Sequence, residues 1–407
     1  MYRLLTMFRG FLEMPVFLER FGIYDPTYSM ASQTAPSGGQ GVPYYFSNVR
    51  SGLIVALLSI GTLIGALSAA PLANRFGRRG TIPFWVGMFC VGVVIQMAVQ
   101  SGQWVGIVMG RWVAGLGVGG LSVLTPLYIS ESTPKQVRGA AVCSYQLFIT
   151  IGIFVADAIN YGTESLTNTA SYRIPMGIGF VWAIILIVGI LLMPESPRYD
   201  IVKGRHERAL RTMTKFYGVP LNHRAVHVET QEINKAIEAA SGDHPWYEVF
   251  TGPRMLYRVL LGMSLQAFQQ LTGANYFFYY GTTIFAGVGI QNSYVTAMIL
   301  GGVNVVCTFP GLYMVEKFGR RKCLFFGALF QAICFLIFAS IGHFQFLPAS
   351  LNGDTATEKS SGTVMIVFAC LFIASFAATW GPMVWYVVFP LPLLISYILM
   401  VMQGLYR

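Results

Sequence analysis

A charged heptapeptide occurs twice in this chain, each time between two long apolar stretches. The first copy is Asn74-Arg75-Phe76-Gly77-Arg78-Arg79-Gly80 and the second is Glu316-Lys317-Phe318-Gly319-Arg320-Arg321-Lys322. Because glycine permits a tight turn, each copy predicts a short hairpin between two membrane-crossing helices. The recurrence of this hairpin in two hydrophobic halves predicts a duplicated membrane unit, which is how many secondary transporters are built.

The composition agrees with a membrane protein. The chain is 55% hydrophobic and 11% charged, whereas soluble domains carry roughly 25% charged residues. A helix needs about 20 apolar residues to cross a bilayer. Nine such stretches are present, at residues 49–72, 82–100, 103–129, 140–161, 173–193, 256–286, 292–315, 322–343 and 363–388. A tenth stretch at 389–404 contains two prolines, and charges interrupt residues 1–20, so neither is predicted as a full span.

The net charge of +10 is explained by topology rather than by a nucleic-acid surface. With these spans, both hairpins and the segments 130–139 and 194–255 lie on one side of the membrane and hold most of the lysines and arginines. The positive-inside rule places that side in the cytosol. We therefore expect no nucleic-acid partner.

The spans predict four parts of the chain. Residues 1–48 hold a remnant of a first span and an external loop, and residues 49–193 form an N-terminal helical bundle. Residues 194–255 form a cytosolic connector of short amphipathic helices, because apolar side chains recur there at helical spacing. Residues 256–407 form a C-terminal bundle. The cysteines and histidines have no metal or disulfide spacing, so we predict no metal, no cofactor and no enzymatic site.

The run Gly115-Leu116-Gly117-Val118-Gly119-Gly120 matches a dinucleotide-binding fingerprint by its letters alone. It lies inside an apolar span with no preceding strand, so we reject that interpretation. Glycines four residues apart, such as Gly115 with Gly119 and Gly61 with Gly65, favour close contact between helices in lipid instead.

A cytosolic gate is the first candidate functional feature. Each hairpin ends in an Arg-Arg pair, and carboxylates stand at Glu131 and in Pro194-Glu195-Ser196-Pro197-Arg198. Guanidinium groups bind carboxylates in a forked geometry. Ion pairs between the cytosolic ends of spans would hold one conformation and break in the other. The alternative is that these arginines only anchor the loops by their charge.

A substrate site is predicted in the span that contains Gln269, Gln270 and Asn275. Carboxamides are costly in hydrocarbon unless they face a cavity, and they donate and accept hydrogen bonds as a hydroxyl-rich neutral ligand requires. A break at Thr272-Gly273 would let them converge. The alternative is that they bond between helices. Gln146 and Asn304 are lone carboxamides in other spans, open to either interpretation, and the Trp380–Trp385 segment adds indoles that can stack on a sugar.

Together these motifs resemble the sugar porter family of the major facilitator superfamily, and fungal monosaccharide transporters in particular. The resemblance extends over about residues 49–388 and rests on an ordered set of motifs: Asn74–Arg79, Gly110-Arg111, Glu131 with Arg138-Gly139, Gln146, Pro194–Arg198, Gln269–Asn275, Glu316–Arg321 and Trp380–Trp385. It implies an all-α polytopic membrane protein with a two-bundle architecture, in which about 9–10 of the family's 12 transmembrane helices are present.

The resemblance also implies roles for individual residues. The positions that contact sugar correspond to Gln146, Gln269, Gln270, Asn275, Asn304 and Trp385. The positions of the cytosolic gate correspond to Arg78, Arg79, Glu131, Arg138, Glu195, Glu316, Arg320 and Arg321. The implied activity is transport of a monosaccharide, a hexose such as glucose, by alternating access, either as proton symport or as facilitated diffusion. We expect a monomer in the plasma membrane that uses no cofactor.

Three departures from the family pattern qualify this expectation. Asn74 replaces an aspartate of the first hairpin, the acidic residue of the first span is missing ahead of Glu13, and the sequence after Trp385 diverges. We therefore expect a truncated product. Two alternatives stay open: a sugar sensor on the same scaffold, which would bind without uptake, and an inactive fragment, which would be absent from the cell surface.

Overall fold

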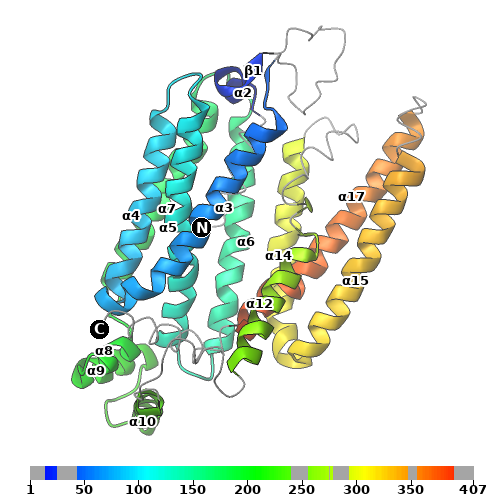
Figure 1. The fold of residues 1–407 in the computed structure, drawn as a ribbon. Helices are drawn as coiled ribbons and strands as arrows, with labels where there is room; N and C mark the ends of the chain where they lie inside the picture. The colour runs from blue at the N-terminus through cyan, green and yellow to red at the C-terminus, as the bar shows by residue number, and fades with distance from the viewer. Residues whose placement is uncertain are drawn as a thin grey trace.

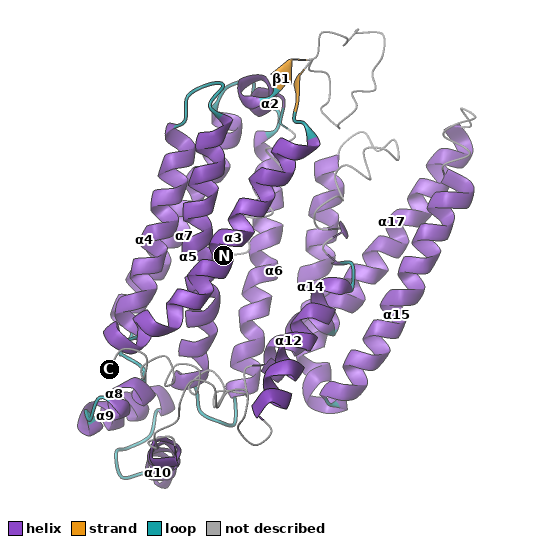
Figure 2. Cartoon of the chain, in the orientation of Figure 1, coloured by secondary structure: helices purple, strands orange, loops and turns teal. Residues whose placement is uncertain are grey.

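The computed structural model describes residues 14–24, 44–239, 255–274, 276–277, 293–346 and 355–388. Helices account for nearly all of this part of the chain (Figure 2). Within the described residues the single sheet is a short hairpin, in which β1 (Ile23–Tyr24) pairs antiparallel with β2 (Tyr44–Tyr45). The fold is therefore all-α, as the sequence predicts.

The first half is a group of long helices that stand side by side (Figure 1). A short helix, α2 (Pro15–Phe21), precedes them. The long helices are α3 (Asn48–Phe76), α4 (Arg78–Ala98), α5 (Trp104–Ser132), α6 (Arg138–Thr163) and α7 (Ala170–Leu192). One hydrophobic cluster runs through this half, from Phe17 of α2 to Ile190 of α7.

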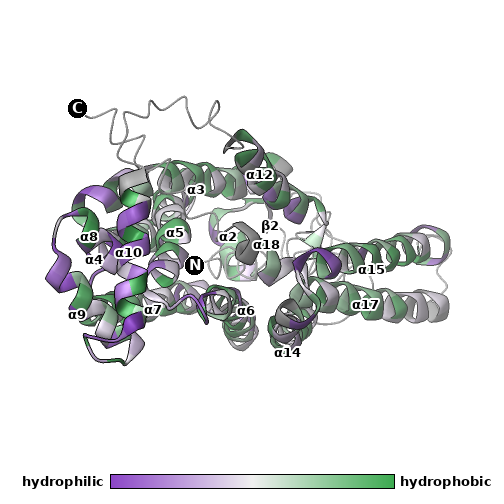
Figure 3. Cartoon of the chain, turned by 90° about the horizontal axis from the view of Figure 1, so that it is seen from below, coloured by the Kyte–Doolittle hydropathy of each residue, from purple (hydrophilic) through white to green (hydrophobic). Residues whose placement is uncertain are grey.

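The connector follows at the end of the molecule where α3 turns into α4 (Figure 1). It contains α8 (Pro197–Val202), α9 (His206–Tyr217) and α10 (Arg224–Ala239). These helices are amphipathic, as expected, and they pack around their own small core of Ile201, Ala209, Met213 and Val226. Viewed from below, hydrophilic and hydrophobic residues both occur along these helices (Figure 3).

The second half contains fewer described helices. They are α12 (Met255–Leu271), α14 (Ser293–Phe318), α15 (Arg320–Ile341), a π-helical turn η1 (Gly342–Phe346), α17 (Thr355–Ala378) and α18 (Trp380–Val388). A second hydrophobic cluster holds this half together and includes Phe277, Phe338 and Phe372.

Eight helices of the described part of the chain are long and apolar enough to cross a membrane. They correspond to eight of the nine predicted spans. The remaining one, predicted at 256–286, begins as α12 and stops at Leu271, because Gly273 takes a φ of +82°. The predicted break at Thr272-Gly273 is therefore confirmed. Residues 278–286 and the apolar tail at 389–404 lie outside the described residues.

The predicted glycine contact joins α3 to α5. A Cβ on Gly119 would lie 2.0 Å from the carbonyl oxygen of Thr62, and one on Gly65 would lie 2.1 Å from that of Leu116. Gly61 and Gly115 approach each other's backbone in the same way. The two helices thus touch backbone to backbone, as small residues allow in membranes.

The two halves meet along α6. In the half of α6 that is farther from the connector, Phe154 packs against Gly301 of α14, where an added Cβ would lie 3.3 Å from the Cα of Phe154. Toward the connector, the sulfur of Cys143 lies 4.0 Å from the carbonyl oxygen of Pro382 in α18. One helix of the first half therefore contacts the second half at two depths.

Asp200 in α8 gives the connector a predictable pH dependence. Its side chain is fully buried, and burial raises the pKa of the carboxyl above its usual 3.8 although Arg208 and Arg205 oppose the shift. Because the pKa of Asp200 is higher in the folded state, the neutral carboxyl group contributes its full share to stability below its ordinary pKa. This contribution is lost as the pH rises through the folded-state pKa. Asp200→Asn should therefore stabilise the connector more at pH 8 than at pH 4, measured by protease resistance of α8–α10. Glu207→Gln, at a side chain that is 90% exposed, should give no pH-dependent gain, and an equal gain for Asp200→Asn at both pH values would contradict the assignment.

Candidate functional site: a cytosolic gate and an amide-lined helix break

The first heptapeptide forms the hairpin that the sequence predicts. Helix α3 ends at Phe76, α4 begins at Arg78, and Gly77 between them has a φ of +85°. A Cβ at Gly77 would also lie 2.4 Å from Oε2 of Glu195. Both the backbone conformation and the close carboxylate therefore require glycine here.

Arg78 and Glu131 form a buried, bidentate ion pair at this hairpin. The Nε of Arg78 donates to Oε2 of Glu131 at 2.9 Å, and Nη2 donates to Oε1 at 2.8 Å. The two side chains are only 6% and 3% exposed. The hydroxyl of Ser196 donates to the same carboxylate at 2.7 Å, and the guanidinium lies over the ring of Tyr199. The pair joins the start of α4 to the end of α5.

Glu195 is held by backbone groups rather than by guanidinium groups. Its carboxylate accepts from the backbone N–H of Arg78 at 2.9 Å, of Arg79 at 3.1 Å and of Ser196 at 2.9 Å. A helix N-terminus favours negative charge, because its first N–H groups have no partner within the helix. The Arg79 side chain donates to the carbonyl of Leu191 at the end of α7. The structure thus brings Arg78, Arg79, Glu131 and Glu195 together within the first half.

Arg138 has a different partner, which the sequence did not reveal. Its Nη2 donates to Oε1 of Glu229 in α10 at 3.1 Å, and Lys135 pairs with Glu232 of the same helix. The basic residues are three apart, and so are the acidic ones, so two matching pairs form between the α5–α6 turn and the connector. The matched spacing is the one signal that could have indicated this contact.

The second heptapeptide repeats the backbone of the first. Helix α14 ends at Phe318, α15 begins at Arg320, and Gly319 has a φ of +78°. The surroundings differ, because a Cβ at Gly319 would meet nothing within 4 Å. Arg320 and Arg321 are exposed, and the side chain of Glu316 lies outside the described residues. The repeated hairpin is confirmed, whereas the gate role of these three residues stays a prediction.

Two of the predicted sugar-site residues converge on the break between α17 and α18. Gln269 is 8% exposed, and its Nε2 donates to the carbonyl oxygens of Trp380 at 2.9 Å and Gly381 at 3.4 Å. A Cβ on Gly381 would lie 3.6 Å from Nε2 of Gln146 in α6. Carboxamides from both halves therefore meet at one break in the helix.

The remaining predicted sugar-site residues differ in their surroundings. Asn304 in α14 is 2% exposed, and its Oδ1 has no hydrogen-bond partner among the described residues. Gln270 is exposed. Asn275 and the side chain of Trp385 lie outside the described residues. An unpartnered buried carbonyl such as that of Asn304 is costly unless a ligand or water reaches it.

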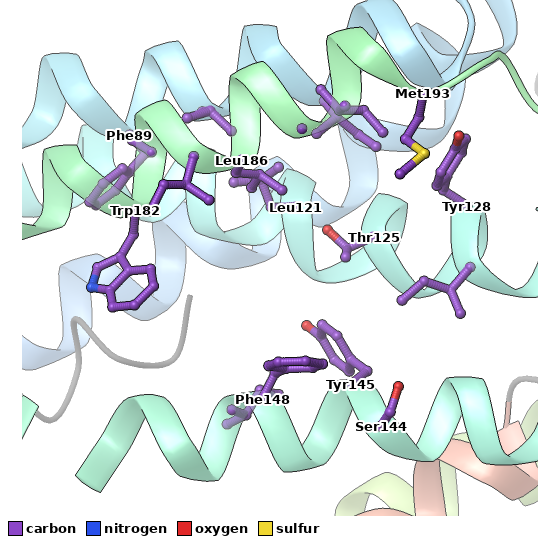
Figure 4. A pocket seen from close by; sticks show the side chains of 18 of the residues that line it. Phe89, Leu121, Thr125, Tyr128, Ser144, Tyr145, Phe148, Trp182, Leu186 and Met193 are labelled. Carbon is purple, nitrogen blue, oxygen red and sulfur yellow. The ribbon is translucent and has the colours of Figure 1, made fainter. Parts of the chain in front are cut away.

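A cavity of about 610 Å³ lies elsewhere, among α4, α5, α6 and α7 (Figure 4). Its walls are mainly apolar and include Phe89, Leu121, Phe148 and Trp182. Four hydroxyl-bearing side chains also line it: Thr125, Tyr128, Ser144 and Tyr145. Neither Gln146 nor Gln269 lines it. The cavity therefore lies apart from the α17–α18 break at which Gln146 and Gln269 meet.

The helices, their pairing and the repeated hairpin define a polytopic membrane protein with the two-bundle fold of the major facilitator superfamily. Solved structures support this class. The chain aligns with the proton:xylose symporter XylE bound to 6-bromo-6-deoxy-D-glucose with a TM-score of 0.72, over 98% of this chain and 85% of that one, at 22% identity. A partially occluded, inward-open XylE from E. coli gives a TM-score of 0.68 at 23% identity, over 98% of this chain and 88% of that one.

Sequence comparison identifies the family. A model described as "Sugar (and other) transporter" matches residues 6–391. The hexose transporter HXT10 of Saccharomyces cerevisiae is 45% identical over 85% of this chain and 63% of its own length. The high-affinity fructose transporter ght6 of Schizosaccharomyces pombe is 44% identical over 85% and 64%, and hexose transporter 2 of Kluyveromyces lactis is 42% identical over 93% and 65%.

The chain therefore belongs to the sugar transporter family. This is a family of transporters and not a class of enzymes. The chain spans 63–65% of the length of these three relatives.

Proposed function

We propose that this chain moves a monosaccharide, a hexose such as glucose, across the membrane by alternating access. The observation that carries the proposal is the meeting of Gln146 and Gln269 at the α17–α18 break, since these side chains come from different halves. A ligand bound there would contact both halves at once. The names of the relatives, which include hexose and fructose transporters, support a sugar as that ligand.

The moving units are the N-terminal bundle at 49–193 and the C-terminal bundle at 256–407, with the connector at 194–255 between them. Separate hydrophobic clusters in the two halves support this division. The buried Arg78–Glu131 pair and the backbone-bound Glu195 would hold the cytosolic ends of the first bundle in one arrangement. We place the protein in the plasma membrane as a monomer.

Proton symport and facilitated diffusion are both compatible with these features. Flux of labelled D-glucose into proteoliposomes separates them, because an imposed proton gradient drives accumulation only in a symporter. A reconstituted chain that binds glucose and moves none would instead be a sensor.

Gln269→Ala tests the site directly. We expect glucose uptake or binding to weaken about tenfold, the worth of one well-made hydrogen bond, while the amount of folded protein is maintained. Gln96→Ala is the matched control, because Gln96 is 2% exposed and donates only to Gly92 of its own helix. Unchanged transport in Gln269→Ala would remove this residue from the sugar site.

A further inference from the structure

The break between α17 and α18 is a single residue, Thr379. Its backbone N–H is shared between the carbonyls of Ser375 at 3.0 Å and Phe376 at 3.3 Å, and its hydroxyl donates to Ser375 at 2.7 Å. The next two carbonyls, of Trp380 and Gly381, are the ones that bind Gln269. The position of Gln269 therefore depends on the geometry of this turn.

One face of α15 also forms hydrogen bonds to this turn and to the residues beside it. Leu324, Gly327 and Gln331 are spaced three and four residues apart and share that face. The carbonyl of Leu324 accepts from the indole N–H of Trp380 at 3.0 Å, and the carbonyl of Gly327 accepts from the Ser375 hydroxyl at 3.4 Å. Nε2 of Gln331 donates to the Thr379 hydroxyl at 3.4 Å.

The turn also fits α15 closely. A Cβ on Gly327 would lie 2.3 Å from Oγ1 of Thr379, so the hydroxyl occupies the space that a larger residue would fill. Gln331 stands one helical turn further along α15, where its amide reaches the same hydroxyl.

Burying the Gln331 side chain at this position costs free energy. Its side chain is 2% exposed, and its Oε1 has no hydrogen-bond partner among the described residues. An apolar side chain of the same size would fill the volume without burying an unpartnered carbonyl. The cost indicates that the amide does something that packing alone does not require.

We propose that Gln331 is a positioning residue for the sugar site. It acts through the Thr379 hydroxyl to fix the turn, and the turn presents the carbonyls of Trp380 and Gly381 to Gln269. Hydrogen bonds from α15 to the turn, and from the turn to Gln269, then set where Gln269 lies before sugar binds. The inference rests on the proposed function for its effect on sugar, while the turn itself can be tested without any sugar.

The first experiment uses a native thiol as a reporter of the turn. Cys323 of α15 is 5% exposed and packs against Met383 of α18, so its alkylation rate reports how firmly α18 is held. In the full-length protein without sugar, Gln331→Met should raise that rate several-fold, measured peptide by peptide with mass spectrometry. Gln96→Met, which removes an equally buried amide far from the turn, should leave the rate unchanged. Equal rates in wild type and Gln331→Met would overturn the proposal.

The second experiment measures sugar affinity. We expect Gln331→Met to raise the Kd for D-glucose at least threefold with a thermal midpoint no lower than that of Gln96→Met, an outcome that a purely structural role would not produce. An unchanged Kd in Gln331→Met overturns the positioning role even if Cys323 reacts faster. If wild type binds no monosaccharide, the proposed function fails, and the Cys323 rates alone decide whether Gln331 holds the turn.

Discussion

We expect Glu131→Gln to lower the free energy of unfolding by about 3–5 kcal/mol, because it leaves a buried guanidinium without its compensating charge. Glu131 is 3% exposed and receives both forked donors of Arg78. Glutamine keeps the size of the side chain but removes the charge and replaces one acceptor oxygen by an NH2 donor. The expected result is a large loss of thermal stability in detergent, measured as the temperature at which the protein ceases to elute as a single species.

The control for this variant is an exposed pair of the same chemistry. Arg211 and Glu207 lie 3.6 Å apart with side chains 77% and 90% exposed, and Glu207→Gln should change stability by less than about 0.5 kcal/mol. The double variant Arg78→Met with Glu131→Gln should recover part of the loss, because it removes both buried charges. A Glu131→Gln protein as stable as the Glu207→Gln protein would show that the pair does not hold the hairpin.

Gly119→Val should prevent folding. The added Cβ would fall 2.0 Å from the carbonyl oxygen of Thr62, and backbone cannot yield as a flexible side chain can. Helices α3 and α5 would have to separate, which breaks the contact on which the first half depends. We expect no monodisperse protein by fluorescence-detected size exclusion.

Gly177→Val supplies the comparison for this variant. Gly177 is in α7, and a Cβ there meets nothing within 4 Å. It should therefore express as wild type does. Normal yield of Gly119→Val would mean that the α3–α5 contact is looser than these distances indicate.

The features that depend on local sequence could be predicted. The length of the apolar stretches located the spans, and the glycines at 77 and 319 indicated the turns. Pairs of glycines four residues apart indicated the contact between α3 and α5. Each of these follows from geometry within one helix or one turn. The break after Leu271 was predictable for the same reason, because Thr272-Gly273 provides a local helix-breaking pair shortly after Gln269 and Gln270.

The features that depend on pairing across the fold could not be predicted. Apart from the matched three-residue spacing of the basic and acidic pairs, the sequence does not connect Arg138 to Glu229, since their contact requires the connector to fold back under α6. The contact of Gln331 with Thr379 could not be predicted either, because the sequence around a lone carboxamide in a span does not indicate its partner. The family resemblance named residues without saying which of them would meet.

The two contacts of α6 with the second half are far enough apart that a tilt of this helix at one contact displaces the other. Phe154 and Cys143 are separated by eleven residues, or about 16 Å of helix, and they touch α14 and α18 respectively. A tilt of a few degrees at Gly301 therefore displaces the far end by on the order of 1 Å, enough to forfeit much of a van der Waals contact. A small tilt of α6 at Phe154 is therefore felt at the contact between Cys143 and Pro382.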